Sequence, residues 1–145
     1  MKLKQVSIFL ENRPGTLSPP LRLLGRAKIN VVTLSIAESN EFGILRLMVR
    51  EWEKVKALLE KEGFVVKVTD VVAVEVVDRP GGLADILDVV EKQGVNIEYM
   101  YAFSEPRMNR GLLIFRFDKP DEAIRALQGN KIKVVESVDW LEQAK

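Results

Sequence analysis

The sequence contains neither cysteine nor histidine. Without cysteine there is no thiol nucleophile, no disulfide and no zinc–thiolate site, and without histidine the usual acid–base group near neutral pH is missing. A carboxylate or lysine enzyme stays open, but the set of common catalytic groups is small. We therefore predict a protein that is not an enzyme and that uses no metal or other cofactor.

Excess charge and long apolar runs are also scarce. Lys and Arg number 22 against 21 Asp and Glu, and the resulting net charge of +1 gives little attraction to nucleic acid or to anionic membranes. No apolar run reaches membrane-spanning length, and the N-terminus lacks the apolar core of a signal peptide. We therefore expect a cytoplasmic protein that binds neither nucleic acid nor membranes.

One segment occurs twice, sixty-six positions apart. Residues 11–17 (ENRPGTL) return without a gap as residues 77–83 (VDRPGGL), and further on residues 29–31 (INV) match residues 95–97 (VNI). Repetition at this period indicates two copies of one structural unit. We predict two domains, residues 1–69 and residues 70–145.

The apolar pattern predicts the same order of elements in both copies. Period-two alternation and β-branched runs predict strands at residues 6–10, 31–36, 43–49, 64–68, 72–76, 97–103, 111–117 and 132–135. Helical spacing predicts helices at residues 17–27, 52–59, 83–90 and 123–127. The order strand–helix–strand–strand–helix–strand is the split βαβ arrangement. The fold class is therefore α+β, with two ferredoxin-like βαββαβ units, each an antiparallel sheet with its helices on one face.

The copies differ in two places. Pro19 and Pro20 stand in the first copy where the second has Asp85 and Ile86, so we expect the first helix to start late, with Ser18 as its N-cap. The turn at residues 104–110 is two residues longer than its counterpart and carries Arg107 and Arg110. We interpret those arginines as a solvated loop tip.

Each Arg-Pro-Gly turn leads from a strand into a helix, where three or four backbone N–H groups lack partners and the helix dipole adds positive charge. A carboxylate fits such a place without a basic side chain. Tight turns without a ligand are the alternative, but two copies in register favour a site. The candidate ligand-binding residues of the two turns are Asn12, Arg13, Pro14, Gly15, Thr16, Leu17, Asp78, Arg79, Pro80, Gly81, Gly82 and Leu83.

Side-chain amides can bind the other end of an amino acid. Asn12, Asn30 and Asn96 offer both donors and acceptors, so an amide oxygen can accept from an α-ammonium while helix N–H groups hold the α-carboxylate. Asparagine before a strand is also common as a plain turn residue. Asp78 replaces Asn12 in the second copy, so the two sites need not be equivalent.

Residues 10–15 (LENRPG) with 29–31, and residues 78–81 (DRPG) with 94–97 (GVNI), resemble the ACT domain, most closely the serine-binding regulatory domain of phosphoglycerate dehydrogenase. The resemblance covers nearly the whole chain as two tandem ACT units without a catalytic domain. It implies units paired side by side into a continuous antiparallel sheet with the helices on one face.

The same resemblance implies ligand sites at the pairing interface, with the Asn12 loop facing Asn96 and the Asp78 loop facing Asn30. A histidine of the dehydrogenase pattern is replaced here by Leu10 and Val76, which indicates a less polar pocket.

The function predicted on these grounds is a regulatory or sensor protein that binds an amino acid or a similar small carboxylate. The predicted partners are a second copy of the chain, giving a homo-oligomer such as a dimer, and a metabolic enzyme. The alternative is a ligand-free interaction module that pairs with such an enzyme or with itself.

Two tyrosines predict a further surface. Tyr99 and Tyr101 lie two apart, hence on one face of a strand beside Ile97, and Leu112 and Ile114 extend that face. An apolar patch of this kind favours an oligomer contact, and Tyr99 is also a candidate ligand contact.

RNA recognition is the competing interpretation of this part of the chain. Residues 110–117 (RGLLIFRF) begin and end like an RNA-recognition motif. Leu112 and Ile114, however, occupy the positions where stacking rings belong, and the near-zero net charge argues against RNA binding as well.

Overall fold

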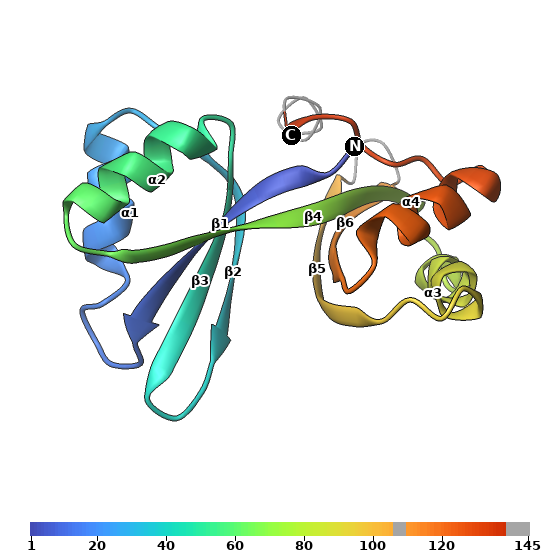
Figure 1. Ribbon diagram of the computed structural model, residues 1–145, viewed down its shortest axis with the longest axis horizontal. Helices are drawn as coiled ribbons and strands as arrows, with labels where there is room; N and C mark the ends of the chain where they lie inside the picture. Colours follow the sequence, from blue (N-terminus) through green and yellow to red (C-terminus); the bar gives the residue numbers. More distant parts are fainter. Residues whose placement is uncertain (106–109, 139–145) are drawn as a thin grey trace. The chain divides into compact units, whose positions relative to one another are not determined.

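The computed structural model describes residues 1–105 and 110–138 (Figure 1). It divides into two compact units, each with its own core. The first unit is formed by Lys4–Thr69, and the second by Met1–Leu3 together with the chain from Asp70 onward.

The first unit places two helices on one face of its strands (Figure 1). Its elements are β1 (Leu3–Glu11), α1 (Ser18–Arg26), β2 (Val31–Glu38), β3 (Phe42–Val49) and α2 (Trp52–Lys61). β3 pairs antiparallel with both β1 and β2. Alternate strand residues point towards the helices. The core that they form with α1 and α2 includes Val6, Ile8, Leu24, Leu45, Leu47, Val55 and Leu59.

A single long strand leads from the first unit into the second. β4 (Val65–Val77) has 13 residues, and its early residue Val66 packs against the first core while Val72 and Val74 belong to the second. The other elements of the second unit are α3 (Gly82–Lys92), β5 (Ile97–Glu105), β6 (Arg110–Phe117) and α4 (Pro120–Gly129). β6 pairs antiparallel with β4 and β5, and both helices again cover one face.

The α+β class and the order of elements are therefore confirmed, except that the strands predicted at residues 64–68 and 72–76 form the single strand β4. The last predicted strand, residues 132–135, is reduced to one bridge between Val134 and Val74. Hydrogen bonds from Glu75 N to Lys133 O (3.0 Å) and from Val135 N to Ala73 O (2.8 Å) flank it. The segment thus lies antiparallel to β4, as expected, but is too short to count as a strand.

The start of α1 differs from the prediction by one position. Ser18 is the first helical residue and Leu17 is the N-cap, so the assignment of Ser18 as N-cap is wrong. Pro19 and Pro20 therefore occupy the second and third helical positions. Both positions belong to the first turn, where an N–H has no partner within the helix and proline is tolerated.

The exposed apolar face predicted around the tyrosines is also wrong. Tyr99 and Tyr101 do share a face, but a bulge between Ile97 and Tyr99 turns Ile97 into the helix-side core. Leu112 and Ile114 are 1% and 0% exposed. Neither side chain is available to a partner at this position.

Candidate functional site

The second Arg-Pro-Gly turn leaves two backbone donors unused. Gly81, with φ of 85°, is the N-cap of α3, and its carbonyl accepts from Asp85 N at 3.0 Å. Gly82 N donates to the Arg79 carbonyl at 3.1 Å. The next two N–H groups of the first turn, those of Leu83 and Ala84, have no acceptor among residues 1–105 and 110–138. This helix end therefore presents two free donors and the positive end of the helix dipole.

Gly82 allows α3 to begin directly against the end of β4. The residue is buried, and a Cβ placed on it would lie 2.5 Å from the Val77 carbonyl oxygen and 3.4 Å from a Val76 methyl group. No real side chain is accommodated at such a distance from backbone. The first unit has Thr16 at the equivalent position, and its helix begins two residues later in the repeat.

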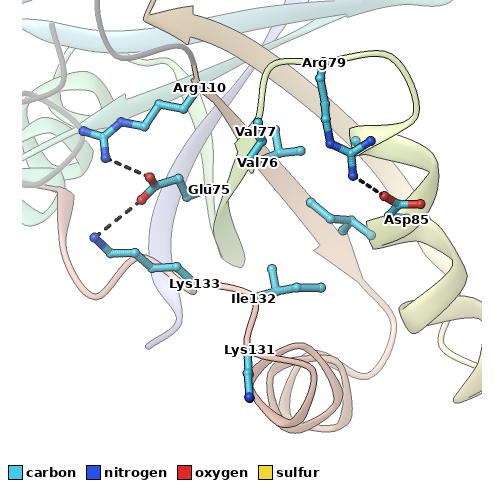
Figure 2. A pocket seen from close by; sticks show the side chains of 11 residues that line it. Glu75, Val76, Val77, Arg79, Asp85, Arg110, Lys131, Ile132 and Lys133 are labelled. Atoms are coloured by element: carbon cyan, nitrogen blue, oxygen red, sulfur yellow. Dashed lines mark hydrogen bonds and ion pairs between the residues drawn. The ribbon is translucent and has the colours of Figure 1, made fainter.

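A pocket of about 330 Å³ lies beside this helix end (Figure 2). Its lining combines charged side chains with an apolar part and the backbone of Gly82. The charged residues are Glu75, Arg79, Asp85, Arg110, Lys131 and Lys133. The apolar residues are Val76, Val77, Ile86 and Ile132. A volume of this size is at the lower end of the range for small-molecule sites.

Glu75 is the centre of the charged cluster in this pocket. Its Oε1 accepts from Arg110 Nη1 at 2.8 Å, and the side chains of Glu75 and Arg110 are 21% and 17% exposed. Its Oε2 lies 3.4 Å from Lys133 Nζ, an ion pair without hydrogen-bond geometry, so this buried oxygen keeps an unused acceptor position among the described residues. Figure 2 shows Arg110 and Lys133 pointing to Glu75 from opposite sides.

A second ion pair lies at the helix end. Arg79 Nη2 is 2.7 Å from Asp85 Oδ2, and Arg79 Nη1 donates to the Pro80 carbonyl at 3.0 Å. Both charged side chains are more than half exposed, so the pair contributes little to stability. It does hold the Arg79 guanidinium beside the first turn of α3 (Figure 2).

The first Arg-Pro-Gly turn is tied to its own unit by hydrogen bonds of Asn12 and Thr16. Asn12 donates from its backbone N to Glu41 O at 2.8 Å and from Nδ2 to Ser39 O at 3.0 Å, which ties it to the β2–β3 turn. Thr16 Oγ1 lies 2.8 Å from the Glu11 carbonyl and 2.9 Å from the Arg13 carbonyl. The side-chain amide of Asn12, which the sequence suggested for ligand binding, therefore uses its nitrogen within the unit.

The remaining predicted residues lie at strand starts or in strands. Asn30 and Asn96 are exposed just before β2 and β5. The Asn96 backbone exchanges two hydrogen bonds with Asp118, at 2.8 and 3.1 Å, which leaves its amide side chain at the surface. Tyr99 is half-buried opposite Arg116. The pairing of the Asn12 loop with Asn96, and of the Asp78 loop with Asn30, stays a prediction.

Two residues of the charged cluster were missed from the sequence, and one was misplaced. Glu75 is a charged residue inside the apolar run 71–77, and this interruption of the strand pattern could have identified it as a candidate. Lys133 carried no signal. Arg110 was interpreted as part of a solvated loop tip, which is wrong, because it opens β6 and is half-buried against Glu75. Arg107 lies outside the described residues.

A profile of the ACT domain pair matches residues 1–144. The chain belongs to the ACT domain pair family. ACT domains are in general regulatory ligand-binding domains, so a tandem ACT chain is of a regulatory type. ACT domains also commonly bind amino acids and form oligomers.

Solved structures share this tandem ACT fold. The crystal structure of protein BT0572 from Bacteroides thetaiotaomicron is 37% identical with a TM-score of 0.91, and the match covers 98% of this chain and 96% of that one. The regulatory subunit of aspartate kinase from Thermus thermophilus, in a ligand-free form, is 19% identical with a TM-score of 0.66, covering 87% of this chain and 91% of that one.

A third structure agrees with these two. The regulatory subunit of aspartate kinase from Thermus flavus is 18% identical with a TM-score of 0.63, covering 87% of this chain and 90% of that one. At these identities, the two Thermus structures show the shared fold alone. Comparison with curated protein sequences gave no match. None of the helices within residues 1–105 and 110–138 has the length and apolar character needed to cross a bilayer.

Proposed function

We propose that this tandem ACT protein is a regulatory sensor that binds a small carboxylate, in the simplest case an amino acid, in the pocket of its second unit. The observation that carries the proposal is the pair of N–H groups on Leu83 and Ala84, which find no acceptor among the described residues and follow Gly82, a lining residue of a pocket with charged walls. A helix N-terminus binds a carboxylate through such groups and through its dipole. Of the candidate residues Asp78–Leu83, Arg79 and Gly82 line this pocket.

The other parts of an amino acid find matching groups in the same pocket. Glu75 Oε2, which accepts no hydrogen bond from the residues that the structure describes, is a partner for an α-ammonium group. Val76, Ile86 and Ile132 offer apolar contact to a side chain. The pocket therefore supplies an acceptor, two donors and an apolar wall, which are the elements needed to recognise an amino acid.

The regulatory part of the proposal includes a partner. Two structures of this fold are described as regulatory subunits of aspartate kinase, which supports a role in which the chain responds to a ligand and acts on a metabolic enzyme. We propose in addition that the chain self-associates, as ACT domains commonly do.

A ligand-free interaction module is the second candidate. It is favoured by exposed apolar side chains of the first unit, among them Phe9, Phe42 and Val65, which are 40%, 55% and 64% exposed. Exposed apolar groups on one unit are typical of a contact with another protein. The ligand and interaction functions predict different results in the same assay.

The assay is a thermal-shift panel over the twenty amino acids. A ligand at a hundredfold excess over its dissociation constant adds about 2.7 kcal/mol to stability, so at least one amino acid should raise the melting temperature clearly. Serine is included because of the resemblance of both turns to the serine-binding domain. A panel in which no amino acid raises the melting temperature would favour the interaction module.

Ala84→Pro tests the helix end directly. The substitution removes one of the two free N–H groups at the third position of α3, so the affinity for the stabilising amino acid should fall by about 1.5–3 kcal/mol, the usual worth of a hydrogen bond to a charged group. The protein should fold, because α1 carries Pro20 at the same helical position. Isothermal titration calorimetry measures the change.

Ala84→Gly is the matched control for that substitution. It keeps the N–H and lowers helix propensity by about 1 kcal/mol, so it separates helix destabilisation from loss of the donor. Equal affinities for the two variants would show that the Ala84 N–H does not contact the ligand.

A further inference from the structure

The two ACT units differ at three equivalent positions near the turn. Glu75 corresponds to Phe9 by the repeat of sixty-six residues. Arg110 corresponds to Phe42, because Arg110 opens β6 opposite the last residue of β4, as Phe42 opens β3 opposite the last residue of β1. The charged pair of the second unit thus stands where the first unit has two phenylalanines.

Lys133 has a counterpart of the same kind. Lys131 and Gly63 have positive φ angles, 61° and 86°, just after the second helix of each unit, and Lys133 and Val65 each follow two residues later. Lys133 therefore corresponds to Val65. The same three places carry exposed apolar side chains in the first unit and an Arg–Glu–Lys cluster in the second.

The surroundings of these three positions also make the first unit less suitable for an anion than the second. An apolar surface that lacks a hydrogen-bond partner disfavours a carboxylate, whose desolvation is costly. In the first unit, Asn12 and Thr16 also donate to backbone carbonyls near the turn, and Pro19 and Pro20 remove two N–H groups from the first turn of α1. The first unit therefore has an apolar surface where the second has a charged cluster, and fewer N–H groups in the first turn of its helix.

The charge of the second pocket narrows the ligand class. Its lining has four cationic and two acidic side chains, a net charge of +2, although the whole chain carries only +1. A neutral amino acid brings no net charge and leaves this excess uncompensated. An acid with a second carboxylate compensates it, and a partly enclosed pocket strengthens that interaction relative to bulk water.

We infer that each chain binds one ligand, in its second unit, and that this ligand is an acidic amino acid or a comparable small dicarboxylate. The inference rests on the proposed function and specifies its ligand class and stoichiometry. One carboxylate binds the N–H groups of Leu83 and Ala84, and the second lies against Arg110 and Lys133. Glu75 orients Arg110 and, for an amino acid, accepts from the ammonium group.

Calorimetry on the full chain tests both the stoichiometry and the ligand class. The probes are L-aspartate, L-glutamate, their neutral isosteres L-asparagine and L-glutamine, and succinate. We expect one ligand per chain and an affinity for the better acidic amino acid about tenfold or more above that of its amide, since one charge-assisted contact is lost in the amide. Added salt should reduce this difference.

Lys133→Gln supplies a variant that folds, because Lys133 is 58% exposed. It should weaken binding of the acid by roughly fivefold to tenfold while changing that of the amide much less. Lys92→Gln, at the far end of α3, is the control and should change neither affinity.

Two ligands per chain, or equal affinities for acid and amide, would overturn this inference and leave the proposed function standing. Binding of other amino acids in the thermal-shift panel, without binding of any of these probes, would overturn it as well. If none of the twenty amino acids and no dicarboxylate bound, the inference and the proposed function would fail together.

Discussion

Replacing Phe115 with alanine should destabilise the second ACT unit by about 3–5 kcal/mol, the usual cost of truncating a buried phenylalanine. Phe115 is 0% exposed and lies in the middle of the core between the strands and both helices. Its ring stacks on that of Phe117, with centroids 4.9 Å apart and planes inclined by 12°. The alanine variant loses this ring contact and leaves a cavity that the rigid strands cannot fill. Urea unfolding followed by circular dichroism measures the loss.

Phe115→Leu is the control for that variant. The first unit has Leu47 at the equivalent position, opposite Val6 as Phe115 is opposite Val72, so a leucine is compatible with this backbone. The leucine variant should lose much less stability, about 1 kcal/mol, because most of the buried volume is kept. Similar urea midpoints for both variants would mean that the core tolerates the cavity and that its packing is looser than the burial indicates.

Replacing Gly82 with alanine should have the second-largest effect, a loss of about 3 kcal/mol from overpacking. The new methyl group would lie 2.5 Å from the Val77 carbonyl oxygen, and a backbone atom cannot move aside as the end of a side chain can. Either the start of α3 or the end of β4 has to shift. We therefore expect the urea midpoint to fall and hydrogen exchange to accelerate in the first turn of α3.

Gly129→Ala provides the comparison in the same unit. Gly129 ends α4, and a Cβ there meets nothing within 4 Å, so alanine should be neutral or stabilising by up to about 1 kcal/mol. The two substitutions add the same methyl group and differ in the space available. If Gly82→Ala were as stable as the wild type, α3 could not begin as close to β4 as the structure places it, and the site at its N-terminus would need revision.

Together these predictions describe a chain whose two repeats share one architecture but differ at the Arg-Pro-Gly turn. The repeat preserves the core positions, so that Leu47 and Phe115 occupy equivalent places in the cores of their units. At the turn the copies are unlike, since a hydrogen bond ties Asn12 to Ser39 in the first unit, while Arg79 and Gly82 of the second turn line a pocket with charged walls. A regulatory chain with one ligand site and one apolar surface is the consequence we propose.

The sequence by itself determined the duplication, the α+β class and the order of elements. These properties depend on patterns of short range: period-two alternation for the strands, helical spacing for the helices, and a gapless repeat of the Arg-Pro-Gly turn. Each pattern depends on residues close together in the sequence, so it can be recognised before any tertiary contact is known. The late start of α1 followed in the same way from Pro19 and Pro20, although the N-cap itself was one residue earlier than expected.

Only the tertiary structure decided which side chains surround the second turn and which carbonyl groups bind the first. Arg110 and Lys133 meet Glu75 from β6 and from the segment after α4, and Asn12 meets Ser39 from the β2–β3 turn. The burial of Leu112 and Ile114 is likewise not reported by the local pattern of the sequence. The physical reason is common to all of these contacts: they join residues far apart in sequence, and their formation depends on strand register and packing rather than on the preference of either segment.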